Sequence, residues 1–183
     1  MRIYFAKVFQ YLKRQSLQLS NFVHSIRLIN PSDASWIFEA CQDQQIQYWT
    51  TVPKPYLMEH AESFANGKTK ELKVWVIEDN QNKPVGLISI HGVDNEGNAE
   101  IGYWVAPWGR GNNAIVNAIS LVEQFAKTMP EIKTIQATIS DINIASQTVA
   151  LRAGLIKAEP SSKMCPAGGV DTTATFYRKA LAV

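Results

Sequence analysis

The stretch from residue 100 to residue 116 reads E-I-G-Y-W-V-A-P-W-G-R-G-N-N-A-I-V, and it decides the fold. In its first part Ile101, Tyr103 and Val105 alternate with other residues, which predicts a strand. A proline and a glycine-rich turn follow, and from Ala114 onward the apolar residues recur at helical spacing. The stretch therefore predicts a strand, a turn and a helix in succession.

The turn between this strand and this helix is suited to an anion. The first backbone N–H groups of a helix lack partners within the helix, and they lie at the positive end of its dipole. Gly109 and Gly111 let a ligand approach the backbone, and Arg110 adds a permanent cation suited to phosphate oxygens. Neither G-x-G-x-x-G after a first strand nor G-x-x-x-x-G-K-[ST] is present. We therefore expect a different phosphate carrier, with a plain turn as the alternative.

Length and composition limit the class of protein. A chain of 183 residues with 46% hydrophobic and 19% charged residues is typical of one soluble globular domain. The net charge of +2 is close to balance and gives no general argument for a nucleic-acid partner. Cys41 and Cys165 lie far apart and show no metal-ligand spacing. We expect two free thiols in a reducing cytoplasm, and no metal site.

The first 25 residues differ from the rest of the chain. Their basic residues are Arg2, Lys7, Lys13 and Arg14, and no acidic residue appears before Asp33. No apolar run of the chain approaches the roughly 20 residues of a membrane span, and Lys7 and Gln10 interrupt any signal-peptide core. We expect residues 1–25 to form a basic extension, either a helix or a mobile arm, and residues 26–183 to form the domain. A membrane-surface or partner-binding arm, or a start codon assigned too early, are the alternatives for the extension.

Periodicity along the chain predicts the order β α α β β β α β α β β. Strands are expected at residues 25–29, 72–77, 85–90, 99–105, 133–139, 155–159 and 172–177, and helices at 33–41, 57–68, 112–128 and 145–152. Short loops make the strands between residues 72 and 105 antiparallel, whereas the intervening helix makes the strand at 133–139 parallel to the strand at 99–105. The predicted fold class is therefore α/β, with a mixed sheet of about seven strands, an antiparallel first half and about four flanking helices.

Several motifs now occur in a fixed order. E-I-G-Y-W-V-A-P and W-G-R-G in the central stretch are followed by N-x-x-S at Asn143 to Ser146 and then by A-G-L, and P-K-P-Y precedes the second helix. This order resembles the GNAT superfamily of acetyl-CoA-dependent N-acetyltransferases. The closest resemblance is to the branch of RimJ- and RimL-type enzymes, which acetylate the N-termini of ribosomal proteins. The resemblance covers about residues 26–179 and leaves the N-terminal extension outside.

The resemblance implies a GNAT-like fold with a splayed parallel central pair of strands and a site for acetyl-CoA. Backbone N–H groups from Gly109 to Asn113 would hold its pyrophosphate, with Arg110 alongside. The cofactor-binding residues expected in this turn are Trp108, Gly109, Arg110, Gly111, Asn112 and Asn113. The pantetheine arm would pair with backbone near Trp104 and Val105, where the two strands splay. Asn143 matches the family position that hydrogen-bonds the pantetheine, and Ser146 matches the position near the sulfur.

Acetyl transfer to an amine needs a neutral amine, a stabilised oxyanion and a protonated leaving group. By resemblance, the backbone N–H of Val105 is the oxyanion donor. Glu100 on the central strand is the candidate general base, acting directly or through water, and an exposed strand glutamate is the alternative. Ser146 would donate a proton to the sulfur, with a polar contact in the first helical turn as the alternative. Many relatives use a tyrosine as the general acid at the position where this chain has Ala150.

The acceptor is expected beside an aromatic loop with two prolines. Tyr48, Trp49 and Tyr56 are its candidate walls, with core packing as the alternative, and the loop at 161–169 is a second wall. The three histidines are scattered along the chain and are interpreted as structural or surface residues: His24, His60 and His91.

We therefore predict a metal-independent acetyltransferase, monomeric or homodimeric, that moves an acetyl group from acetyl-CoA to a primary amine by direct attack. The branch favours a protein N-terminal α-amine as the acceptor, and a polyamine, amino acid or aminoglycoside is the enzymatic alternative. Few acidic residues in the acceptor loops argue against a strongly cationic acceptor. A non-catalytic coenzyme A-binding sensor is a further alternative. It stays open because Asn113 stands where the family usually has a small residue, and because the tyrosine acid is missing.

Overall fold

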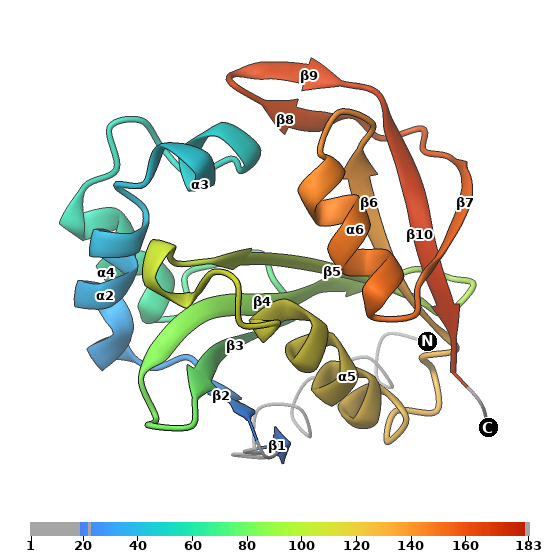
Figure 1. Cartoon of the computed structure of the whole chain (residues 1–183), viewed down its shortest axis with the longest axis horizontal. Coiled ribbons are helices and arrows are strands. Elements are labelled where there is room, and N and C mark those ends of the chain that lie inside the picture. The colour runs from blue at the N-terminus through green and yellow to red at the C-terminus, as the bar shows by residue number, and fades with distance from the viewer. Residues whose placement is uncertain (1–18, 22, 182–183) are drawn as a thin grey trace.

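A bent eight-stranded sheet in the order β1-β2-β3-β4-β5-β6-β10-β7 forms the centre of the computed structural model, which describes residues 19–21 and 23–181 (Figure 1). The strands of this sheet are β1 (Leu19–Asn21), β2 (His24–Leu28), β3 (Lys73–Asp79), β4 (Pro84–Val93), β5 (Asn98–Val105), β6 (Thr134–Ser140), β7 (Ile156–Pro160) and β10 (Ala174–Ala180). A separate hairpin pairs β8 (Cys165–Ala167) with β9 (Val170–Thr172). The predicted mixed α/β sheet is confirmed, and β1 and the hairpin are additions to it.

Five α-helices surround the sheet in the described part of the chain. They are α2 (Ala34–Ala40), α3 (Gln44–Trp49), α4 (Met58–Ala65), α5 (Ala114–Ala126) and α6 (Ile144–Arg152), and the 3-10 turns η1 (Pro31–Asp33) and η2 (Pro107–Gly109) precede α2 and α5. Four of these helices match the predicted ones, whereas α3 was not predicted. Helix α3 buries only Ile46, so its sequence shows no apolar periodicity. Its N-terminus is capped by Asp43, whose side chain accepts a hydrogen bond from the backbone N–H of Ile46.

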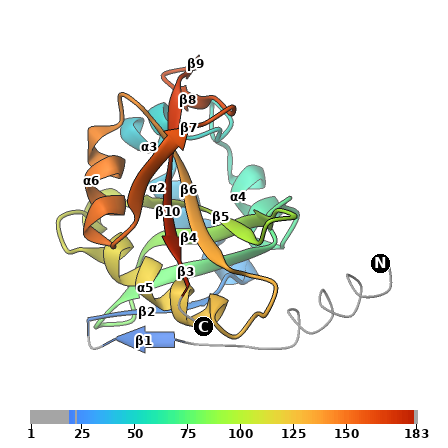
Figure 2. The ribbon, with the colours of Figure 1, turned by 90° about the vertical axis from the view of Figure 1, so that its right-hand side faces the viewer.

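The strands β5 and β6 form a fork. They run parallel, as predicted, but pair only at Asn98 with Thr134, Ala99 with Ile135, and Glu100 with Gln136. Beyond Glu100, β5 stays with β4 and β6 stays with β10, so the sheet divides into two arms. In Figure 2, β6, β7 and β10 run upright while β3 and β4 lie across the view. The fork between the arms confirms the expected splay of the central pair.

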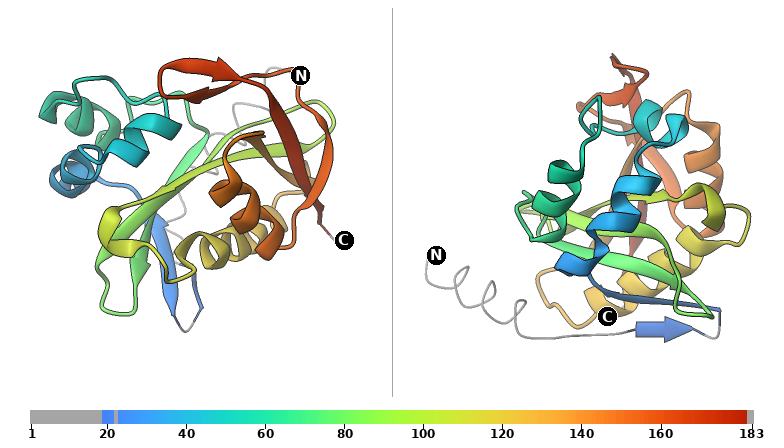
Figure 3. Two further views of the ribbon diagram at one scale, coloured as in Figure 1. Left: turned by 45° about the horizontal axis from the view of Figure 1, so that its top comes forward. Right: turned by 90° about the vertical axis from the view of Figure 1, so that its left-hand side faces the viewer.

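Two hydrophobic clusters cover opposite faces of the first arm. On one face, α5 packs Ile115, Ile119, Val122 and Phe125 against residues of β3 to β5, and the rings of Phe125 and Trp75 lie 5.1 Å apart. On the other face, α2 and α4 pack against Val74, Val76 and Leu87. The right-hand view of Figure 3 shows α2, α3 and α4 on the near side. Because successive strand residues point to opposite faces, β5 presents Tyr103 to the first cluster and Trp104 to the second.

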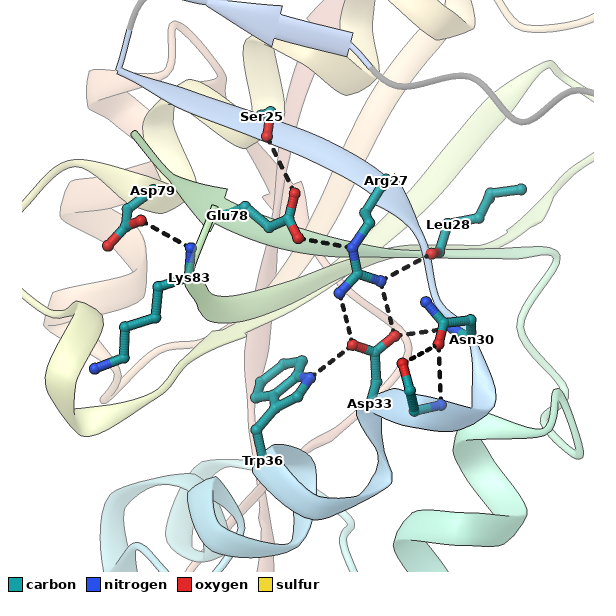
Figure 4. Close-up of polar contacts among 10 residues, drawn as sticks. Ser25, Arg27, Leu28, Asn30, Asp33, Trp36, Glu78, Asp79 and Lys83 are labelled. Carbon is teal, nitrogen blue, oxygen red and sulfur yellow. Dashed lines mark hydrogen bonds and ion pairs between the residues drawn. The ribbon is translucent and has the colours of Figure 1, made fainter. Parts of the chain in front are cut away.

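A partly buried ion pair fixes α2 to the sheet (Figure 4). The guanidinium of Arg27 donates to both carboxylate oxygens of Asp33, at 2.7 and 2.8 Å, and to Glu78 Oε1 at 2.7 Å. Asp33 also accepts a hydrogen bond from Trp36 Nε1 at 2.8 Å. The ring of Trp36 lies 5.7 Å from that of Trp104 on β5. This chain of contacts therefore sets the position of Trp104 beside the fork.

Part of the predicted N-terminal extension can be placed. Residues 1–18 and 22 lie outside the described residues, whereas residues 19–21 form β1, which pairs antiparallel with β2. The sheet thus begins before residue 26, where the domain was expected to start. No helix among the described residues is long and apolar enough to cross a membrane.

Candidate active site

A cavity of about 880 Å³ lies in the fork and is lined from both faces of the sheet. One part, which we call the α6 half, is lined by Tyr103, Ile115, Asn143, Ser146 and Val149. The other part, the α4 half, is lined by Trp49, Phe64, Glu71, Leu87, Ser89 and His91. Since β5 and β6 are not paired here, the cavity connects the two faces through the sheet.

The glycine turn forms one end of the cavity. Asn113 precedes α5 in the left-handed conformation, with φ of 59°, and its side chain does not cap the helix. The first N–H groups of α5 are therefore not covered by a capping side chain, which leaves them open to an anion. Gly111 also has a left-handed φ of 84°, and a Cβ added there would meet nothing within 4 Å.

The other turn residues differ in their roles. Trp108 donates through Nε1 to the carbonyl of Pro84 at 2.8 Å, which anchors the turn to the start of β4. A Cβ on Gly109 would lie 2.6 Å from Cβ of Val85, so Gly109 is needed for packing rather than for ligand approach alone. Trp108 and Asn112 line a neighbouring cavity of about 520 Å³.

Arg110 leaves the turn and reaches the other side of the main cavity. Its guanidinium forms an ion pair with Asp43, the residue that caps α3. Burial acts to raise the pKa of Asp43, but the hydrogen bonds from Arg110 and from backbone N–H groups outweigh it and lower that pKa. The predicted phosphate ligand is therefore already engaged with a carboxylate.

Glu100 lies where β5 and β6 stop pairing. Its Oε1 accepts hydrogen bonds from the backbone N–H of Thr138 at 2.9 Å and from Thr138 Oγ1 at 2.6 Å. Its Oε2 accepts from Gln136 Nε2 at 2.6 Å. Both oxygens of the carboxylate thus bridge the two strands at the start of the fork. The general-base role of Glu100 stays a prediction.

Ser146 has a partner that the sequence analysis did not nominate. The hydroxyl of Tyr103 on β5 lies 3.0 Å from Ser146 Oγ, and both residues line the cavity. Asn143 accepts a hydrogen bond from the backbone N–H of Ser146 at 3.0 Å and so caps α6. Ala150, at the expected tyrosine position, is fully buried. The sequence signal for Tyr103 was its place in the E-I-G-Y-W run, but strand alternation alone gave it only a core role.

The three predicted acceptor residues occupy different positions. Trp49 lines the cavity, whereas Tyr56 is a core residue with 6% exposure in the cluster with α2 and α4. Tyr48 packs edge-on against Trp49, and its carbonyl accepts a hydrogen bond from the N–H of Gly168 at 2.8 Å. The left-hand view of Figure 3 shows the β8–β9 hairpin reaching towards α3. Tyr48 thus joins α3 to this hairpin.

The hairpin supplies the second wall. Lys163, Met164, Cys165 and Pro166, from the loop predicted at 161–169, line the cavity. Trp104 and Val105 line it from β5. Within residues 19–21 and 23–181, no three His, Cys, Asp or Glu residues are grouped so that they could hold a metal ion.

Comparison with known families agrees with this architecture. The family profile described as "Acetyltransferase (GNAT) domain" matches residues 25–156. None of the curated proteins is similar enough in sequence to match the chain.

Solved structures of similar fold include three acetyltransferases. RimL, a ribosomal-protein α-N-acetyltransferase solved with coenzyme A, is 15% identical with a TM-score of 0.77, covering 90% of this chain and 98% of RimL. Spermidine N-acetyltransferase from Vibrio cholerae, solved with CoA and spermine, is 16% identical with a TM-score of 0.73. The match covers 88% of this chain and 97% of the spermidine acetyltransferase. The microcin C7 self-immunity acetyltransferase MccE, solved with acetyl-CoA and AMP, is 21% identical with a TM-score of 0.74. The match covers 87% of this chain and 93% of MccE.

Proposed function

The chain belongs to the GNAT acetyltransferase family, and we propose that it transfers the acetyl group of acetyl-CoA to a primary amine. The observation that carries the proposal is the cavity that passes through the β5–β6 fork, with the uncapped end of α5 beside it. A long donor with an anionic end and a reactive thioester fits such a cavity. An amine can then meet the thioester from the opposite face.

The donor would occupy the α6 half. Its pyrophosphate would lie at the N-terminus of α5 with Arg110 beside it, and its pantetheine would follow the edge of β5 that faces the fork. In this placement the sulfur lies near Ser146. The similar structures of RimL and MccE, which contain coenzyme A and acetyl-CoA, support this choice of donor.

The reaction would proceed by direct attack. The neutral amine attacks the thioester carbonyl carbon, forming the C–N bond, and the oxyanion is stabilised by a backbone N–H such as that of Val105. The C–S bond then breaks with its electron pair on sulfur, Ser146 donates a proton to the thiolate, and the second proton lost by the acylated nitrogen restores the Ser146 hydroxyl. The proton lost by the ammonium must go to a base in the α4 half, and Glu100 is the candidate from the sequence.

Two acceptor classes follow from this arrangement. The first is the N-terminal α-amine of a protein, as in RimL. The second is a polyamine, as in the spermidine acetyltransferase, and it is favoured by Glu71 and Glu100, two carboxylates that line the cavity.

Calorimetric titration with acetyl-CoA tests the donor, and a panel of amines tests the reaction. We expect micromolar binding that weakens in Arg110→Ala. Release of free CoA is then followed with a serine-initiated hexapeptide and with spermidine, and the acetylated product is identified by mass. Binding without turnover of any amine would favour a coenzyme A sensor, whereas absence of binding would contradict the proposal.

A further inference from the structure

His91 owes its place to an irregularity in β4. The pairing of β4 with β5 shifts register between Ile90 and Gly92, so His91 lies in a bulge. Its ring lies over Gly102, because a Cβ added to Gly102 would come within 2.1 Å of His91 Nε2. The imidazole therefore occupies the space that a side chain at position 102 would otherwise take, directly on the central strand. It is half exposed and lines the α4 half of the cavity.

Glu71 faces this ring from the loop before β3. Its Oε2 lies 3.4 Å from His91 Nε2, at ion-pair rather than hydrogen-bond geometry. The same oxygen is buried and has no hydrogen-bond partner among the described residues. A buried carboxylate oxygen without a donor is costly. A protonated imidazole, or the ammonium group of an acceptor, would supply that donor.

We propose that His91, oriented by Glu71, is the general base that takes the proton from the acceptor ammonium. This inference rests on the proposed acetyl transfer. An N–H bond of the ammonium breaks with its electron pair left on nitrogen, and the proton forms a new bond to His91 Nδ1, because Nε2 faces the Glu71 carboxylate. The amine, now neutral, attacks the thioester, and the imidazolium is stabilised by Glu71 until it returns the proton to solvent.

Glu100 is less available for this step than His91. Its Oε1 already accepts two hydrogen bonds from Thr138 and its Oε2 accepts one from Gln136, so only one of the roughly four acceptor sites of the carboxylate is left for a proton. Histidine, in contrast, is the side chain that serves most often as a general base. Besides Glu71, the other ionisable side chains that line the cavity are Glu100, Tyr103, Arg110, Arg152, Lys163 and Cys165.

The test compares wild type, His91→Gln, Glu71→Gln and Glu100→Gln between pH 5 and pH 9. Each variant is assayed with the amine that wild type acetylates best and with hydroxylamine, which is mostly neutral at pH 7 and so does not need a base to remove an ammonium proton before attack. For His91→Gln we expect kcat with the amine to fall by about 100-fold, loss of the acidic limb of the pH profile and an unchanged KM for acetyl-CoA. The rate with hydroxylamine should stay within about threefold of wild type, because only the base-dependent step is lost.

Glu71→Gln should give a smaller loss of kcat than His91→Gln, since the base remains and only the carboxylate that orients it is removed. His60→Gln is the matched control, because His60 lies on α4 and does not line the cavity. Thermal unfolding and acetyl-CoA titration show that each variant is folded.

Three outcomes would overturn the inference. If His91→Gln keeps both its rate and its acidic limb while Glu100→Gln loses them, Glu100 is the base. If hydroxylamine and the amine lose rate equally in His91→Gln, the residue acts on folding or donor placement instead. If wild type binds acetyl-CoA but acetylates neither the amines nor hydroxylamine, the proposed function fails, and the inference fails with it.

Discussion

The hydroxyl of Tyr103 lies 3.0 Å from Ser146 Oγ and joins the central strand to the first turn of α6. Burial raises the pKa of Tyr103 to about 12, against the opposing effect of the hydrogen bond with Ser146. Tyr103 therefore keeps its proton over the ordinary pH range, and its hydroxyl can donate a hydrogen bond to Ser146 Oγ. With the donor placed as proposed, the hydroxyl hydrogen of Ser146 would then be free to point at the thiolate in the α6 half.

Replacing Tyr103 by Phe should lower kcat by about tenfold, since one hydrogen bond that orients the proton donor is lost. The KM for acetyl-CoA should change little. If Tyr103 acts through Ser146, adding Tyr103→Phe to Ser146→Ala should cost almost nothing more, which a double-mutant cycle measures. Tyr177→Phe is the control, because Tyr177 is a buried tyrosine outside the cavity. Additive losses would show that Tyr103 acts independently of Ser146.

The ion pair between Arg110 and Asp43 should compete with the donor. Asp43→Asn removes the carboxylate charge but keeps an oxygen that can cap α3, so it frees Arg110 without removing the cap. We expect acetyl-CoA to bind about threefold more tightly to Asp43→Asn and about tenfold more weakly to Arg110→Ala. Calorimetric titration at low and high salt measures both. Equal affinity of Asp43→Asn and wild type at low salt would mean that Arg110 does not contact the donor.

The contact between Tyr48 and Gly168 should hold the hairpin over the cavity. A Cβ at Gly168 would lie 2.6 Å from the Tyr48 ring, so Gly168→Ala should displace the hairpin from α3. The KM for the amine should rise several-fold while acetyl-CoA affinity is kept. Gly169→Ala is a close control, because Gly169 also has a left-handed φ, of 91°, but a Cβ there meets nothing within 4 Å. A similar rise in both variants would assign the effect to backbone strain alone.

The Arg27–Asp33 pair should make stability depend on pH. Burial acts to raise the pKa of Asp33, but hydrogen bonds from Arg27, Trp36 and the backbone of Asn30 lower it below its usual value of 3.8. Because the folded-state pKa is depressed, the stabilisation is present above pH 3.8 and is lost as pH falls through the folded-state value.

Asp33→Asn should therefore destabilise the protein by roughly 3 kcal/mol at pH 7, because it leaves the buried end of Arg27 without its bidentate partner. The loss should shrink towards pH 3. Urea unfolding at both pH values measures it, with the exposed Glu131→Gln as the control. A loss that is the same at pH 3 and pH 7 would contradict an ionic origin.

The sequence predicted what depends on local pattern. Alternation in β5, the proline and glycines of the turn and the apolar spacing of α5 are local signals, and they placed the strand, turn and helix correctly. Helix α3 escaped detection because a single buried residue, Ile46, gives no periodicity. The predicted strand at 172–177 begins instead at Ala174, since residues 170–172 turn back into the hairpin.

The features of the site that were missed depend on contacts between distant segments. His91 was interpreted as a structural or surface residue, and its position over Gly102 arises from a bulge in the pairing of two strands. The bond between Tyr103 and Ser146 joins residues 43 positions apart. The packing role of Gly109 depends on Val85 of the neighbouring strand. No local pattern contains such relations.

With the substrates placed as proposed, the fork would give them separate entrances, because the cavity is lined from both faces of the sheet. Neither substrate would have to leave before the other could enter or depart. Spent CoA would then act as an inhibitor competitive with acetyl-CoA, while the amine could not displace it at any concentration. The rate of acetylation would thus follow the cellular ratio of acetylated to free coenzyme, even where the acceptor is abundant.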